Sequence, residues 1–227
     1  MGVLAAAEHG YMEISKIELH GVLPAVFASR GAAGSEVWCR DVVLERGRRY
    51  LVSAKSGTGK SSLCSYLYGY RNDYAGHILF GGTDISTLGV GKWCELRSRH
   101  IAYLPQEMRL FPELTAMENV ELKNRLTGYR GVGDIKAMFD RLGIADKMGE
   151  PVARLSIGQQ QRVAIIRALC QPFDFILLDE PVSHLDEANN RLAADLVADE
   201  AARQGAGIIA TSVGNNVMLT IDKEYKL

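Results

Sequence analysis

A glycine-rich segment, SAKSGTGKSS at residues 53–62, carries residue types that bind phosphate. Gly57 and Gly59 allow backbone N–H groups to approach phosphate oxygens with no Cβ in the way. The ammonium group of Lys60 can then reach a β- or γ-phosphate, the hydroxyl of Ser61 can ligate Mg²⁺, and Ser62 can contact an α-phosphate. The predicted phosphate-binding residues are Ser56, Gly57, Thr58, Gly59, Lys60, Ser61 and Ser62.

The neighbours of this loop favour the same interpretation. A segment rich in β-formers, residues 48–54, precedes it, and residues 60–70 have the spacing of a helix. A helix N-terminus adds partial positive charge where the phosphates would lie. The pattern departs from the usual motif at Ala54, where a glycine is expected. The alternative is an ordinary Gly–Ser turn that exposes a lysine.

A second group of reactive residues ends the hydrophobic segment FILLDE, residues 175–180. Asp179 is placed to hold a water molecule of a magnesium shell, and Glu180 is placed to orient and deprotonate an attacking water. Two solvated acids at a strand end are the alternative. Pro181 and the segment SHLD at 183–186 make that alternative weaker.

The rest of the sequence predicts the elements that must position these groups. Apolar and β-branched patterns predict strands, and 3.6-residue periodicity predicts helices between them. Alternating buried strands and helices are typical of a parallel sheet with crossover helices. The predicted strands are 14–23, 36–45, 48–54, 76–82, 100–105, 173–179 and 207–212, and the helices are 60–70, an insertion over 115–154, 159–169 and 187–204.

Composition narrows the class of protein. The chain has 227 residues, which suits one α/β domain with an inserted subdomain. Its 26 basic and 27 acidic residues leave a net charge of −1, so we expect no nucleic-acid partner. No apolar run approaches a membrane span, and the N-terminus lacks the features of a secretion signal, so we expect a cytoplasmic protein. Four cysteines without a CxxC pair are interpreted as packing residues.

Three further motifs carry a resemblance to a known family. LSIGQQQR at 155–162 resembles the LSGGQ signature of ATP-binding-cassette ATPases, SHLD resembles their D-loop, and Gln106 in AYLPQE is similar to their Q-loop glutamine. The resemblance implies a P-loop NTPase with a RecA-like parallel sheet, an antiparallel β-subdomain and a helical subdomain at about 107–165, within one domain spanning 1–227. It also implies ATP and Mg²⁺ as ligands and ATP hydrolysis as the activity.

The family resemblance assigns further roles. Two cassettes of this family enclose two ATP molecules head to tail, so Ser156, Gly158 and Gln159 would contact the nucleotide of a second copy of the chain. Gln106 would join the magnesium shell beside Ser61 and Asp179 and act with Glu180 in catalysis. Phe27 would stack on adenine, with core packing as its alternative role.

Two positions depart from the family pattern. Ile157 replaces the first glycine of LSGGQ, and Ser212 stands where the family carries a histidine that contacts the γ-phosphate. We therefore expect slow or partner-dependent hydrolysis. The alternative function is an ATP-binding regulatory subunit with poor hydrolysis.

The segment at 110–128 is similar to the lipoprotein-release, macrolide-export and cell-division branch of the family. This similarity implies a separate integral membrane permease as partner, with the chain peripheral on the inner face of the cell membrane. A soluble cassette ATPase of DNA repair or translation is less favoured, because only 48 residues separate Gln106 from Leu155 and leave no room for long coiled coils. P-loop GTPases are disfavoured because the chain has no NKxD motif.

Overall fold

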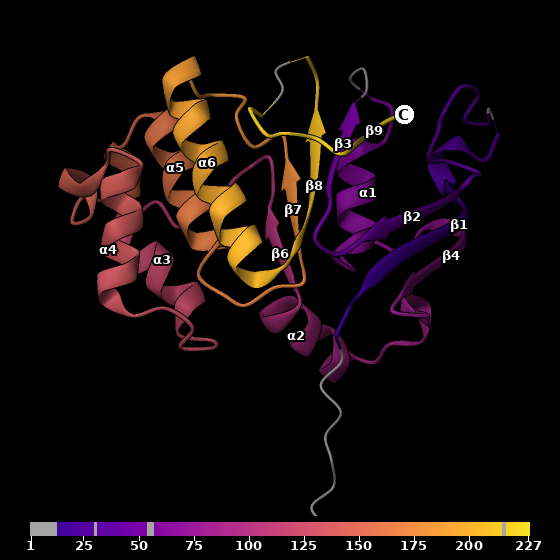
Figure 1. Cartoon of the computed structure of the whole chain (residues 1–227), viewed down its shortest axis with the longest axis horizontal. Helices are drawn as coiled ribbons and strands as arrows, with labels where there is room; N and C mark the ends of the chain where they lie inside the picture. The colour runs from indigo at the N-terminus through magenta and orange to yellow at the C-terminus, as the bar shows by residue number, and fades with distance from the viewer. Residues whose placement is uncertain (1–12, 30, 54–56, 215–216) are drawn as a thin grey trace, which may run out of the picture.

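The computed structural model describes residues 13–29, 31–53, 57–214 and 217–227. A five-stranded parallel sheet forms its centre, in the order β6-β7-β8-β3-β9 (Figure 1). The strands are β3 (Arg49–Ser53), β6 (Ile101–Leu104), β7 (Phe175–Asp179), β8 (Gly207–Ser212) and β9 (Lys223–Lys226). Every residue of β7 and β8 is buried, as expected for parallel strands covered on both faces.

A second, antiparallel sheet lies at the right of Figure 1 and has the order β2-β1-β4-β5. Its strands are β1 (Lys16–Pro24), β2 (Asp41–Glu45), β4 (Tyr74–Phe80) and β5 (Thr83–Asp84). Alternate side chains of β2 are buried, because only one face of this sheet packs on the core.

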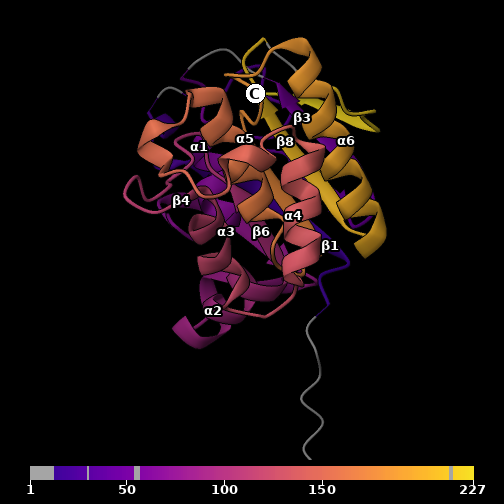
Figure 2. The same ribbon diagram turned by 90° about the vertical axis from the view of Figure 1, so that its left-hand side faces the viewer.

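Helices fill the space around the parallel sheet. Helix α1 lies between the two sheets, whereas α3, α4, α5 and α6 gather at the left of Figure 1. From that side, α4 lies in front of α5, with α6 next to it (Figure 2). The helices are α1 (Lys60–Leu67), α2 (Val90–Arg99), α3 (Ala116–Asn124), α4 (Val132–Arg141), α5 (Ile157–Ala168) and α6 (Glu187–Gln204).

The parallel sheet separates two hydrophobic cores. Ile176 and Ile208 pack with the helices α3 to α6, while Phe175, Leu177 and Ile209 pack with α1 and the antiparallel sheet. Successive side chains of a strand point to opposite faces, so β7 and β8 contribute to both cores. This arrangement confirms the predicted fold class. The boundaries of the single domain, 1–227, and of the helical subdomain, about 107–165, stay predictions.

Two sequence predictions were wrong in detail. The strand predicted over 36–45 begins only at Asp41, because the Ser35 hydroxyl accepts hydrogen bonds from the backbone N–H groups of Val37 and Trp38 and holds a turn there. Cys39 and Cys94 are exposed, so of the four cysteines only Cys64 and Cys170 are packing residues. None of the described helices has the length and apolarity needed to cross a membrane.

Gly207 of β8 packs closely on Phe175 of β7, and its replacement tests this packing. A Cβ at this position would lie 2.6 Å from the ring of Phe175, which is fully buried. We expect Gly207→Ala to lower the free energy of unfolding by about 1–3 kcal/mol through overpacking, measured by urea denaturation. Gly133→Ala in α4 is the control. It has open space around its Cβ and should raise stability by about 0.5–1 kcal/mol; equal effects of both changes would contradict the packing described.

Candidate functional site

A cavity of about 410 Å³ opens at the carboxyl ends of β3, β6 and β7. It brings together residues from segments far apart in the sequence, including most of the predicted phosphate loop, Gln106 and Glu180. Such an edge is where open α/β sheets bind ligands. The lining residues are Val26, Phe27, Gly57, Gly59, Lys60, Ser61, Ser62, Arg71, Gln106 and Glu180.

The loop between β3 and α1 has the backbone conformation that its glycines allow. Gly57 and Gly59 have φ angles of 81° and 98°, and Gly59 is the N-cap of α1. A residue with a side chain is strained at such angles, which explains why glycine occupies both positions. The side chain of Lys60 is only 5% exposed and faces the cavity rather than bulk solvent. Ser56 and Ala54 lie outside the described residues.

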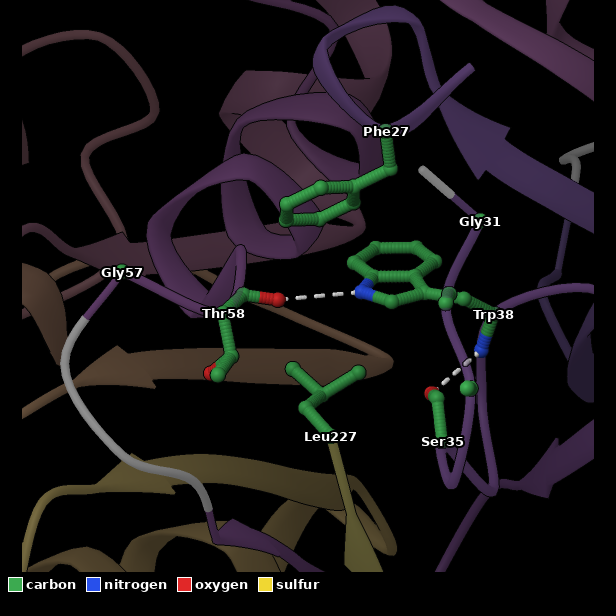
Figure 3. A pocket seen from close by; sticks show the side chains of 9 residues that line it. Phe27, Gly31, Ser35, Trp38, Gly57, Thr58 and Leu227 are labelled. Carbon is green, nitrogen blue, oxygen red and sulfur yellow. Dashed lines mark hydrogen bonds between the residues drawn. The ribbon is translucent and has the colours of Figure 1, made fainter. Parts of the chain in front are cut away.

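Trp38 packs against this loop and donates a hydrogen bond to it. Its indole nitrogen donates a hydrogen bond to the carbonyl oxygen of Thr58 at 3.1 Å, as Figure 3 shows. A Cβ on Gly59 would lie 3.1 Å from the ring of Phe27 and 3.2 Å from that of Trp38. The two rings therefore occupy the space next to Gly59. A neighbouring cavity of about 290 Å³ is lined by Phe27, Trp38 and Thr58, which make these contacts (Figure 3).

Phe27 is 8% exposed, so its ring contributes to the core and also lines the cavity. These positions agree with the packing role and leave the stacking role a prediction.

The acidic end of the site is organised by one hydroxyl group. Thr211 Oγ1 donates to Asp179 Oδ1 at 2.7 Å and accepts a hydrogen bond from the backbone N–H of Glu180 at 3.2 Å. Asp179 is 2% exposed, and this bond fixes one oxygen of its carboxylate. The neighbouring strand β8 thus holds both acids of β7 in place.

The Glu180 carboxylate lies next to both Lys60 and Gln106. One carboxylate oxygen lies 3.9 Å from Lys60 Nζ, and the other accepts a hydrogen bond from Gln106 Nε2 at 3.3 Å. Its φ angle of 51° is in the left-handed region, which is uncommon for a residue other than glycine. Backbone strain of this kind clusters at functional sites.

The buried thiol of Cys64, near Asp179, stays protonated. Burial, and then the negative charge of Asp179, raise the pKa of the Cys64 thiol well above its usual value. Burial likewise raises the pKa of Tyr103, with Cys64 and Asp179 adding to the effect. Both groups stay neutral at physiological pH, so Asp179 and Glu180 supply the negative charge of the site.

The start of α5 carries the predicted signature residues Ser156, Gly158 and Gln159, none of which lines the cavity. Ser156 and Gln159 form a reciprocal capping box, in which the Ser156 hydroxyl accepts from the Gln159 N–H and the Gln159 side chain accepts from the Ser156 N–H. A Cβ on Gly158 would lie 2.9 Å from the carbonyl oxygen of His184. Ile157, between Ser156 and Gly158, is 47% exposed.

Four residues of the site were missed from the sequence. Trp38 and Thr211 support the loop and the acids, Arg71 donates to the Ser62 hydroxyl at 3.1 Å, and Gln161 bonds to the loop after β7. Arg71 also pairs with Asp73, which lowers the pKa of that carboxyl. Gln161 lies inside the signature segment and Thr211 lies near the end of the strand predicted over 207–212. These were the only available signals.

Ser212 ends β8 and is 1% exposed. A buried serine stands where a histidine was expected, so the consequence of that replacement for hydrolysis stays a prediction.

Comparison with known proteins shows which proteins this chain is similar to. The family model described as ABC transporter matches residues 41–183. The macrolide export ATP-binding/permease protein MacB of Rhodopseudomonas palustris is 34% identical over 201 residues, which are 86% of this chain but 30% of that protein. The lipoprotein-releasing system ATP-binding protein LolD of Legionella pneumophila is 30% identical, over 81% of this chain and 82% of its own.

A solved structure agrees with these relatives. The dimeric bacterial ABC transporter cassette MJ0796 superposes with a TM-score of 0.72 at 26% identity, covering 86% of this chain and 87% of its own.

Thr211 offers a direct test of the acidic end. Thr211→Val keeps the shape but leaves Asp179 Oδ1 and the Glu180 N–H without their partner. We expect turnover of magnesium-ATP to fall about 10- to 100-fold, since a hydrogen bond to a charged group contributes about 1.5–3 kcal/mol. Thr211→Ser retains the hydroxyl and should keep turnover within about twofold. Equal turnover of the valine and serine variants, both with native melting temperatures, would disprove the role of the hydroxyl.

Proposed function

The chain belongs to the ABC transporter family, and we propose that it is the ATP-binding and ATP-hydrolysing subunit that powers a separate membrane permease. The observation that carries this proposal is the convergence of Lys60, Gln106 and Glu180 on one cavity. The lysine binds the β- and γ-phosphates. The glutamine joins the magnesium shell beside the γ-phosphate, and Glu180 orients and deprotonates the attacking water.

ATP occupies the cavity with its phosphates on the loop. Gly57, Thr58 and Gly59 present backbone N–H groups and Ser62 contacts the α-phosphate. Ser56, which lies outside the described residues, is proposed as a further phosphate-binding residue. The cavity continues to Val26 and Phe27, so the base lies at that end with Phe27 against adenine.

The residues present also fit a magnesium ion. Mg²⁺ prefers oxygen ligands and is usually held by one or two protein groups together with substrate phosphates. Ser61, Asp179 and Gln106 offer a hydroxyl, a carboxylate and an amide oxygen. Among the described residues no cluster of three or more His, Cys, Asp or Glu side chains could hold a metal alone. The ion, when bound with ATP, neutralises charge on the β- and γ-phosphates.

A second copy of the chain completes each site. Ser156, Gly158 and Gln159 lie at a helix N-terminus outside the cavity of their own chain. A helix N-terminus favours an anion, so this segment contacts the γ-phosphate bound by the partner copy. The exposed Ile157 narrows that approach.

The permease partner docks in a groove between the parallel sheet and the helical insertion, and the chain is thereby held on the inner face of the cell membrane. The groove has a volume of about 290 Å³, and its lining combines aromatic, apolar and cationic side chains. No acid lines it, so a partner segment with acidic and apolar side chains fits it. The lining residues are Tyr68, Tyr70, Tyr103, Pro105, Arg109, Phe111, Leu122, Lys123, Leu126, Arg167 and Ala168.

Local contacts prepare the groove for a charged partner. The guanidinium of Arg109 lies 5.0 Å from the centre of the Tyr70 ring, and Phe111 and Leu126 are 53% and 64% exposed. Burial, reinforced by Arg167, lowers the pKa of Lys123 to about 8. An acidic partner beside this lysine would raise its pKa again, and the docking energy would include that contribution.

A regulatory subunit with poor hydrolysis is the second candidate function. The buried Ser212 in place of histidine and the exposed Ile157 in the signature favour it.

The first test is magnesium-dependent ATP hydrolysis over a range of protein concentrations, with Glu180→Gln in parallel. Turnover per subunit should rise with concentration, because each site needs two copies, and should fall by about 100-fold or more in the variant, as loss of a general base predicts. The variant should still bind ATP, whereas Lys60→Ala should not. Tight binding of ATP without hydrolysis by the native chain would support the regulatory function instead.

The second test concerns the groove. Arg109→Glu reverses one exposed charge beside Tyr70, and we expect it to reduce recovery of an integral membrane protein, identified by mass spectrometry, from native membranes at least fivefold. Lys136→Glu, on the exposed side of α4 and outside the groove, is the matched control. Undiminished recovery with Arg109→Glu would place the permease elsewhere, and recovery of water-soluble partners alone would disprove the permease.

A further inference from the structure

Three consecutive glutamines at the start of α5 make different contacts. Gln159 closes the capping box with Ser156. Gln160 donates to the carbonyl oxygens of Val152 and Leu155, so its bonds stay within the segment that leads into α5. Gln161 instead reaches across to the loop that follows β7. Only Gln161 of the three joins α5 to a residue of the cavity.

Gln161 uses both ends of its amide in this contact. Its Nε2 donates to the carbonyl oxygen of Glu180 at 3.3 Å, and its Oε1 accepts from the backbone N–H of His184 at 3.0 Å. The side chain is 2% exposed. Water therefore does not compete for these bonds, and their loss would leave buried polar groups without partners.

Gln161 binds the backbone of Glu180, which has a strained conformation. Glu180 has a φ angle of 51°, a conformation that a residue with a Cβ adopts only when its surroundings impose it. Its N–H is held by Thr211 and its C=O by Gln161, so the peptide groups on both sides of its Cα are fixed. With both fixed, the direction of the Cα–Cβ bond of Glu180 is fixed, and from there its carboxylate reaches Lys60 and Gln106.

A second contact links the same two segments. The backbone of Gly158 lies so close to His184 that a Cβ there would come within 2.9 Å of the His184 carbonyl oxygen. His184 is thus held at its N–H by Gln161 and approached at its C=O by Gly158, both from the first turns of α5. Helix α5 and the loop 180–185 are therefore joined at three points.

We propose that Gln161 is a positioning residue that couples the signature helix α5 to Glu180, so that a displacement of α5 reorients the carboxylate proposed as general base. The coupling rests on the proposed role of Glu180. It gives α3 and α4, which pack against α5, a direct mechanical path to the hydrolytic centre within one chain.

Gln161→Leu and Gln160→Leu form the test, since neighbouring side chains of the same type on the same helix are changed in the same way. The first measurement is hydrogen–deuterium exchange over residues 180–185 in the nucleotide-free chain, which needs no turnover. We expect exchange of the His184 amide to accelerate at least tenfold in Gln161→Leu and less than twofold in Gln160→Leu. Unchanged exchange in Gln161→Leu, or equal acceleration in both variants, would overturn the coupling.

The second measurement is hydrolysis at saturating magnesium-ATP in a single turnover with protein in excess. Gln161→Leu should lower the rate constant at least tenfold while the Kd for ATP changes less than twofold; a purely structural defect would weaken ATP binding and lower the melting temperature as well. Gln161→Glu keeps the acceptor for His184 but loses the donor to Glu180, and should be as slow as the leucine variant. A Gln161→Glu variant as fast as the native chain would refute the positioning of Glu180.

Failure of this inference and failure of the proposed function give different results. If Glu180→Gln leaves hydrolysis intact, the proposed general base is wrong, whereas the exchange result still reports whether Gln161 holds the loop. If Glu180→Gln abolishes hydrolysis and Gln161→Leu does not change it, the base is right and the coupling is wrong.

Discussion

Burial of β7 between β6 and β8 is the constraint on which the site depends. The strand is buried along its whole length, so its register against both neighbours is fixed by packing and by the parallel hydrogen-bond ladder. Asp179 faces Thr211 in that register, and the Thr211 hydroxyl binds both acids that end the strand. A shift by one residue would turn Asp179 to the other face and separate it from the phosphate loop. The chemistry of the site is thus a consequence of sheet register.

The phosphate loop depends on a different part of the molecule. Trp38 and Phe27 come from the segments beside the antiparallel sheet, yet the rings of both pack against Gly59, and the Trp38 indole N–H donates to the carbonyl oxygen of Thr58. The cavity therefore lies where the two sheets meet, with Lys60 from the start of α1 and Glu180 from the residue that follows β7. Three segments must be correctly packed before Lys60, Gln106 and Glu180 can converge.

Local signals in the sequence predicted many of the elements. Helix α6 and strand β8 have the predicted bounds, because Asp186 caps the helix, Gly205 ends it at a φ angle of 60°, and the next residues are uniformly apolar. The turn at 36–40 was missed because two backbone hydrogen bonds to the Ser35 hydroxyl override the β-forming tendency of Val37 and Trp38. The order of strands was not predicted from the pattern, since it depends on which strands the crossover helices bring together.

The sequence by itself determined the phosphate loop, the two acids, the signature segment and the family to which they point, because these features rest on residue types at fixed short spacings. Only the tertiary structure decided what supports them. Trp38 is 20 residues from Thr58, Gln161 is 19 from Glu180, and Thr211 is 32 from Asp179. Each of these contacts is made through a side chain whose partner is chosen by packing and register, and neither can be read from local periodicity.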